Sequence, residues 1–199
     1  MSCDYKIISK LAYTSQIPMP STQNANLSSD NGSIPVQYAG IVLLNNYLPA
    51  LFERLKLIDE NRKFISTQSQ HQAVASLYYL VSGVAIDRPP SSALLNLVCG
   101  LPLSTAIDQT TEISEDCQTL INGLIQAVIE HWPAMGNTSV QGFRESWLIR
   151  DGLLRAQEDR WELRVERRIY DILISKSPFA FSVIKYPWTS KPLHVHWPY

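Results

Sequence analysis

Two histidines, His194 and His196, have the residue type and spacing that metal chemistry requires. They alternate with Leu193, Val195 and Trp197, and this pattern predicts a strand with both imidazoles on one face. A zinc site needs at least one further ligand, and no third ligand lies at a recognisable spacing in the sequence. We therefore favour a solvated strand face and keep a metal-dependent enzyme as the minor alternative.

Cysteine, serine and phosphate chemistry have weaker signals. Cys99 and Cys117 lie in apolar helical segments, whereas a reactive thiolate needs exposure and nearby positive charge, so both are expected in the core. A triad could combine Ser139 and His131 with an aspartate, but no nucleophile elbow surrounds the serine. The glycines are dispersed, so no glycine-rich loop can hold phosphate. The sequence predicts no catalytic residue, no cofactor and no metal ligand.

Charge and hydropathy give no reason to expect nucleic acid or membrane as a partner. The formal net charge of -1 provides no long-range attraction to phosphate or anionic lipid. The one basic cluster is interleaved with glutamates, which indicates ion pairing on a solvated strand. Its members are Arg160, Arg164, Arg167 and Arg168. No apolar run approaches the ~18 residues of a membrane span. Residues 1–10 lack the features of a signal peptide, so we expect synthesis in the cytoplasm.

Most of the first 150 residues are predicted to be helical, because their apolar residues recur at helical spacing. The predicted helices cover residues 48–58, 67–82, 94–98, 113–132 and 140–148. The fourth is the best defined, because Ser114 can cap it and acidic residues follow in its first turn.

A polar corner at residues 131–150 organises the rest of the chain. Pro133 ends the long helix, since the residue before a proline is pushed out of the α region. Thr138 and Gln141 have the spacing of a capping box, so a further helix begins there. The chain is helical before this corner and consists of short strands and turns after it.

After residue 152 the spacing of the apolar residues changes from the helical period to the two-residue period of a strand. Residues 153–157 and 161–166 flank a polar turn and predict a hairpin that is apolar on one face and charged on the other. A brief helical turn is expected over residues 169–173, and residues 193–197 predict a closing strand. The fold class is therefore α+β, a mainly helical domain of about five helices with a small antiparallel β-hairpin or sheet at its C-terminal end.

The composition divides the chain into two parts. Residues 1–37 are interpreted as a flexible N-terminal arm or linker, and residues 38–199 as the folded docking domain. Between Ser15 and Ser33 the chain is rich in Ser, Asn, Gln, Thr and Pro, and it cannot bury enough apolar surface to offset its ordering entropy. A long ordered loop is the alternative interpretation.

Four blocks of residues, taken in order, resemble one known family. The blocks are residues 39–44 with Leu48, Pro49, Leu51 and Phe52; Asn96 with residues 99–103; Trp132 with residues 137–139, Gly142, Arg144 and Glu145; and residues 161–167 with Asp171, Pro187, Trp188, Val195 and Trp197. Over residues 38–197 they resemble the characteristic domain of the tape measure protein family of contractile injection systems, phage-tail-like particles that drive a tube into a target. The departures are mild and comprise Tyr38, Phe143, Phe179 and Thr189, where the family has Asn, Leu, Trp and Met.

This resemblance implies a structural, non-enzymatic component that docks to the baseplate hub, the spike or the tube end during assembly and is incorporated in the particle. Family members carry a much longer region ahead of this domain. Residues 1–37 reach only ~120 Å when fully extended at ~3.3 Å per residue, so docking is expected rather than length measurement by this chain alone. A soluble adaptor or assembly chaperone of the particle is the alternative.

Four residues are candidates for contacts with such a partner: Asn137, Arg144, Glu145 and Trp188. Trp188 follows a proline, and tryptophan is a common anchor of interfaces. If the docking face includes the corner, Arg144 and Glu145 are expected to be exposed beside Asn137. The competing hypothesis is that Arg144 and Glu145 are buried and tie the corner to the hairpin.

Overall fold

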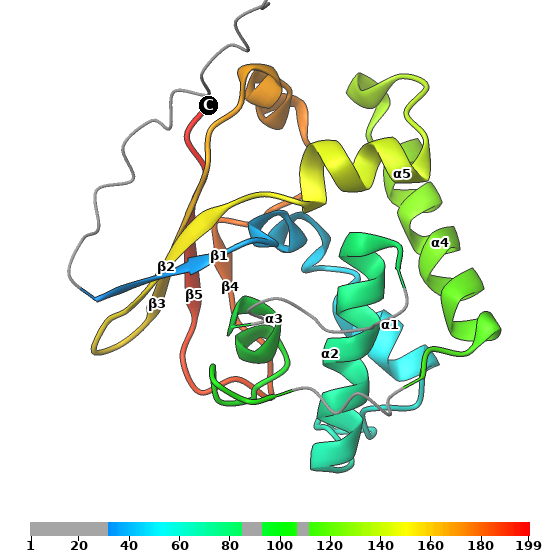
Figure 1. The fold of residues 1–199 in the computed structure, drawn as a ribbon, viewed down its shortest axis with the longest axis vertical. Coiled ribbons are helices and arrows are strands. Elements are labelled where there is room, and N and C mark those ends of the chain that lie inside the picture. The colour runs from blue at the N-terminus through cyan, green and yellow to red at the C-terminus, as the bar shows by residue number, and fades with distance from the viewer. Residues whose placement is uncertain (1–31, 85–92, 107–111) are drawn as a thin grey trace, which may run out of the picture. The chain divides into compact units, whose positions relative to one another are not determined.

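A mixed β-sheet draws its strands from both ends of the described chain (Figure 1). The computed structural model describes residues 32–84, 93–106 and 112–199, which all belong to the unit Asn31–Tyr199. The strand order is β1-β2-β3-β5-β4. The strands are β1 (Ser33–Val36), β2 (Gly152–Ala156), β3 (Trp161–Val165), β4 (Val183–Ile184) and β5 (Leu193–His196).

The predicted hairpin is present as β2 and β3, which pair antiparallel. Leu154 lies opposite Leu163, and both side chains are buried. The next pair along the hairpin, Arg155 and Glu162, is charged and belongs to the other face, because successive side chains of a strand alternate. The apolar and charged faces are therefore those that the period of two predicted.

The sheet is mixed, so the prediction of a purely antiparallel sheet is wrong. β5 runs parallel to β3, with Val195 opposite Leu163. Parallel neighbours need a crossover connection of a dozen or more residues, and the chain between β3 and β5 provides one through η4 (Ile169–Lys176) and β4. The period of a strand does not indicate the direction of its neighbour, which is why the sequence did not show this pairing.

Strand β1 lies within the stretch that was interpreted as an arm, residues 1–37. It pairs antiparallel with β2 at the edge of the sheet. Pro35 fits there, because one side of an edge strand makes no ladder hydrogen bonds. Residues 33–36 are therefore part of the folded unit, whereas the predictions for residues 1–31 lie outside the described residues.

The helices gather on one side of the sheet, and they confirm the mainly helical α+β class (Figure 1). They include α1 (Leu48–Arg54), α2 (Thr67–Ser82), α3 (Ala93–Val98), α4 (Glu115–Glu130) and α5 (Val140–Phe143). Ser66, Ser114 and Ser139 cap α2, α4 and α5 by accepting a hydrogen bond from the amide three residues on. Thr138 does not form the capping box that its spacing to Gln141 suggested, because it donates its hydroxyl hydrogen to the Met135 carbonyl oxygen at 2.7 Å.

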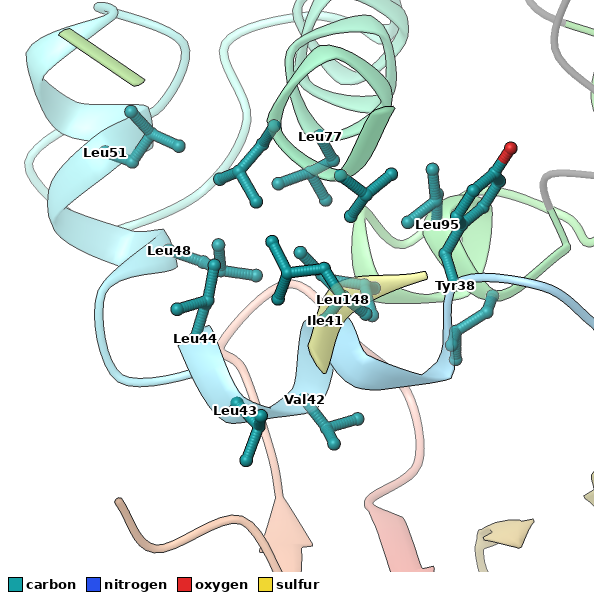
Figure 2. Close-up of a cluster of buried hydrophobic side chains, with 14 of the residues drawn as sticks. Tyr38, Ile41, Val42, Leu43, Leu44, Leu48, Leu51, Leu77, Leu95 and Leu148 are labelled. Carbon is teal, nitrogen blue, oxygen red and sulfur yellow. The ribbon is translucent and has the colours of Figure 1, made fainter. Parts of the chain in front are cut away.

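The 3₁₀ helix η1 (Ala39–Leu44) forms the centre of the core, and all of its residues are buried. Ile41 points toward Leu148, while Val42 and Leu43 lie on the opposite side of η1 (Figure 2). The element passes between the sheet and the helices, so it needs apolar side chains on both of its sides. This position explains why the sequence is apolar throughout η1 and shows no helical period there.

Gly40 has no room for a side chain. A Cβ atom at this position would lie 1.7 Å from the Trp147 carbonyl oxygen and 2.7 Å from Leu148 Cα. Beside it, the Ala39 amide donates to the Arg150 carbonyl oxygen at 2.9 Å. Such a close approach of two backbones requires glycine. The contact joins η1 directly to the corner.

Candidate functional site

The corner at residues 131–150 folds as short helical pieces after α4. The 3₁₀ turn η2 (Pro133–Met135) comes first, and α5 then continues into the π-helical turn η3 (Arg144–Leu148). The Ile149 amide donates to the Arg144 carbonyl oxygen at 2.8 Å, which is the wider hydrogen-bond pattern of a π-helix. Single π turns inside helices occur frequently at functional sites.

An open hollow of about 440 Å³ lies between the end of α4 and the loop that follows it. Ile129 and Glu130 from α4 line it on one side, and Gly136 and Asn137 from the loop line it on the other. Glu130 and Asn137 are exposed, whereas Ile129 is buried. The lining of the hollow therefore combines an exposed amide and an exposed carboxylate with a buried isoleucine.

Arg144 is buried, with only 5% of its surface exposed, so the expectation that it is exposed is wrong. Its Nε donates to the Leu80 carbonyl oxygen at 2.9 Å, and its Nη2 donates to Asn122 Oδ1 at 2.8 Å. The guanidinium also lies 5.5 Å from the centre of the Tyr79 ring. Burial lowers the pKa of Arg144 from its ordinary value. The residue is a structural partner, but it ties the corner to α2 and α4 rather than to the hairpin.

Glu145 and Asn137 are both exposed on the corner. Gln141 Nε2 donates to Glu145 Oε1 at 2.7 Å, a spacing of one helical turn on the surface. Arg144 is thus buried, whereas the adjacent residue Glu145 faces solvent. Of the candidates on the corner, Glu145 and Asn137 are available to a partner.

Trp188 lies away from the corner and is half-buried. Its indole N–H donates to the Val98 carbonyl oxygen at 2.8 Å. Its ring stacks on Tyr186 with centroids 4.8 Å apart, and it also contacts Phe52 and Phe64. The indole N–H of Trp188 is thus already hydrogen-bonded to α3, and its ring packs in an aromatic cluster.

A buried ion pair between Arg150 and Asp171 was missed by the sequence reasoning. Neither residue has any exposed surface. Arg150 Nη2 and Nη1 donate to the two Asp171 carboxylate oxygens at 2.6 and 3.1 Å. The guanidinium also lies 5.0 to 5.4 Å from the ring centres of Trp147, Tyr170 and Trp197. An aspartate within an apolar stretch was the signal that could have indicated a buried partner.

The carboxylate of Asp171 has further donors. The Arg168 amide and the Trp197 indole N–H each donate to Oδ2, at 2.8 and 3.1 Å. Burial by itself raises the pKa of a carboxyl group, but the hydrogen bonds from Arg150, Arg168 and Trp197 outweigh it, so the pKa of Asp171 lies below its ordinary value. Both oxygens of the Asp171 carboxylate accept hydrogen bonds, which is the condition under which a buried ion pair is tolerated.

Arg168 and Tyr170 fasten η4 to the π-helical turn of the corner. Arg168 donates to the carbonyl oxygens of Glu145 and Ile149 at 3.2 and 3.1 Å. The Tyr170 hydroxyl donates to the Ser146 carbonyl oxygen at 3.1 Å. A π turn leaves carbonyl groups without their usual helical partners, and these two side chains satisfy them. Hydrogen bonds from these two side chains therefore join η4 to the corner.

His194 and His196 are exposed on the outer face of the sheet, as the solvated-strand interpretation predicted. Together with Arg164 and Val183 they border an open hollow of about 630 Å³. Within the described ranges, no group of three or more His, Cys, Asp or Glu residues is placed to hold a metal ion.

Cys99 and Cys117 are buried, as predicted. Burial raises the pKa of both thiols, because it disfavours the charged thiolate. Both cysteines therefore serve as small apolar residues of the core.

Comparison with known proteins gives one match. The sequence model of the contractile injection system tape measure protein family matches residues 9–197. The match confirms the resemblance, and it begins well before residue 38, where the resemblance was placed. Comparisons with curated proteins and with solved structures give no match. In the part of the chain that the structure describes, no helix is long and apolar enough to cross a membrane.

Proposed function

Because the chain belongs to the contractile injection system tape measure protein family, we propose that it docks to the baseplate hub, the spike or the tube end of such a particle during assembly. The observation that carries this proposal is the family match, which extends over nearly the whole chain. The family is one of structural proteins rather than of enzymes, and it supports a structural role in a contractile injection system.

The hydrogen bonds that hold the corner in place support docking through its exposed residues. Arg144 joins the corner to α2 and α4, and Arg168 donates a hydrogen bond to the Glu145 carbonyl oxygen in the π turn. The backbone that carries Glu145 is therefore held in one arrangement before any partner arrives. A preorganised surface loses less conformational entropy on binding than a mobile one.

The test is to purify the particles by sedimentation and to measure their proteins by quantitative mass spectrometry. We expect this chain in mature particles at a fixed ratio to the tube protein. Detection in assembly intermediates alone would favour the soluble adaptor or assembly chaperone. Consistent absence from both fractions would contradict the proposal.

A matched pair of variants tests whether the corner is part of the docking face. Glu145 and Glu60 are both exposed glutamates, and only Glu145 lies on the corner. We expect Glu145→Arg to lower incorporation into particles several-fold, because it reverses the charge of a contact residue, whereas Glu60→Arg should leave it unchanged. Equal incorporation of the two variants would remove Glu145 from the docking face.

A further inference from the structure

The short helix η4 buries a carboxylate and exposes two of its three isoleucines, whereas its third isoleucine, Ile174, is buried. A surface helix normally turns its charged side chains toward solvent and its apolar side chains toward the core. In η4 the carboxylate of Asp171 has no exposed surface, whereas Ile169 is 101% exposed and Ile172 is 70% exposed. Tyr170 between them is 36% exposed. We call the exposed side chains of Ile169, Tyr170 and Ile172 the apolar tip.

The apolar tip is held outward by the same contacts that hold Asp171 inward. Turning η4 so that Ile169 entered the core would remove Asp171 from the Arg150 guanidinium and from the Trp197 indole N–H. Both ion-pair partners would then lose their compensating charge, which is strongly unfavourable for buried groups. The exposed isoleucines are therefore a fixed feature of the folded protein, and fraying of a helix end does not explain them.

Positive charge flanks the apolar tip on both sides. Arg167 precedes η4 and Lys176 ends it; both are exposed. Neither makes an ion pair with another described residue. Asp171 is neutralised by Arg150 inside the protein, so it does not offset these cations at the surface. The tip thus combines projecting apolar side chains with two exposed cations, Arg167 and Lys176, that form no ion pair with the described residues.

We propose that the apolar tip inserts into a concave, apolar groove with a carboxylate-lined rim on another protein of the injection particle, an inference that rests on the proposed function. The projecting isoleucines require a concave partner, since interface anchors fill pockets. The positive charges of Arg167 and Lys176 select an acidic rim, because complementary charge steers association and fixes register. A lipid surface fits less well, because two isoleucines on so short an element bury little apolar area in a membrane.

The experiment measures binding of the full chain to the purified baseplate hub, spike and tube proteins of the same particle by biolayer interferometry. The test variant is the double substitution Ile169→Asp with Ile172→Asp. The control is Ile65→Asp with Val84→Asp, which changes two aliphatic residues that are each 62% exposed elsewhere on the surface. We expect the test variant to weaken the Kd by about tenfold or more, and the control to leave it unchanged.

The charges are tested separately with Arg167→Glu combined with Lys176→Glu. This variant should weaken binding several-fold and should remove most of the dependence of the Kd on salt concentration. Unchanged binding and salt dependence would contradict the acidic rim. All variants are first compared by thermal unfolding, so that loss of binding is read only from folded protein.

The remaining outcomes separate the two proposals. If the wild-type chain binds none of the three proteins and is absent from particles, the proposed function fails and this inference fails with it. If the wild-type chain binds and the Ile169→Asp, Ile172→Asp variant binds equally well, the inference alone is overturned. Isoleucine-dependent self-association in light scattering, or isoleucine-dependent binding to vesicles of phosphatidylserine and phosphatidylcholine, in place of binding to the particle proteins, would also overturn it.

Discussion

The short elements η1 and η4 are both rich in aliphatic residues, but they occupy opposite environments. Every residue of η1 is buried, because the sheet covers one side and the helices cover the other. In η4, Asp171 is buried on Arg150, and Ile169 and Ile172 are left in solvent. Aliphatic content alone therefore does not decide whether an element is buried. The position of a charged residue whose partner lies inside the protein can decide it.

The largest effect is expected from Gly40→Ala in η1. The added Cβ would meet the Trp147 carbonyl oxygen at 1.7 Å, and neither backbone can move without displacing the core. We expect a loss of more than about 4 kcal/mol in the free energy of unfolding, or no folded protein. Urea denaturation measures it.

Gly123→Ala in α4 is the control for this substitution, because a Cβ there meets no atom within 4 Å. It should stabilise the protein by up to about 1 kcal/mol, since alanine is the better helix former. A Gly40→Ala protein as stable as Gly123→Ala would show that η1 is not tightly packed.

The second largest effect is expected from Asp171→Ala in η4. It leaves the Arg150 guanidinium buried without a counter-charge, which costs about 3–5 kcal/mol of unfolding free energy. Replacing both partners, as Asp171→Leu with Arg150→Met, should cost less than the single change, because no charge is then buried unpaired. A double variant that is less stable than Asp171→Ala would contradict this account.

Leu43→Ala in η1 should lower the free energy of unfolding by about 2–5 kcal/mol. Leu43 has no exposed surface, so the substitution leaves a cavity between η1 and the sheet. Chemical denaturation measures the change. A loss below about 1 kcal/mol would mean that the core collapses around the missing side chain.

The ion pair of η4 should also make stability depend on pH in the acid range. The pKa of Asp171 in the folded protein lies below its ordinary 3.8. Its stabilising contribution is therefore complete above the unfolded-state pKa and is lost as the pH falls through the folded-state pKa. Between about pH 6 and about pH 2, the unfolding free energy of the wild-type protein should fall more steeply than that of Asp171→Asn. Parallel curves would contradict the lowered pKa.

The smallest effect is expected from Ile169→Ala. The side chain is 101% exposed, so its removal should change the free energy of unfolding by no more than about 0.5 kcal/mol. Together with Leu43→Ala, this variant measures the difference between the two elements directly. A loss of several kcal/mol would mean that Ile169 packs against the protein in solution.

The sequence predicted the features that local interactions determine. The apolar stripe and the Ser114 cap define α4, and the period of two around a polar turn defines the hairpin of β2 and β3. It left the burial of Arg144 open and did not predict that of Asp171, because their partners Leu80 and Arg150 lie 64 and 21 residues away in the chain. The spacing of apolar residues within one helix or strand does not indicate which distant residue a charged side chain will contact.

The same limit applies to the candidate site. Exposure of Glu145 and Asn137 was predicted correctly, since short polar segments at a corner face solvent. Trp188 was expected to be an exposed anchor, but its indole N–H is bound by the Val98 carbonyl oxygen, 90 residues away. The alternation of buried and exposed residues within the π turn also depends on its irregular geometry, which propensities do not indicate.

The position of β5 has a consequence for biosynthesis. This strand is the last of the sheet to leave the ribosome, yet it lies between β3 and β4. Until residues 193–196 have emerged, β3 therefore keeps one open edge whose amide and carbonyl groups can recruit a strand from another nascent chain. The sheet is complete only after β5 has been synthesised, and a chain that terminated before β5 would be prone to aggregate through that edge.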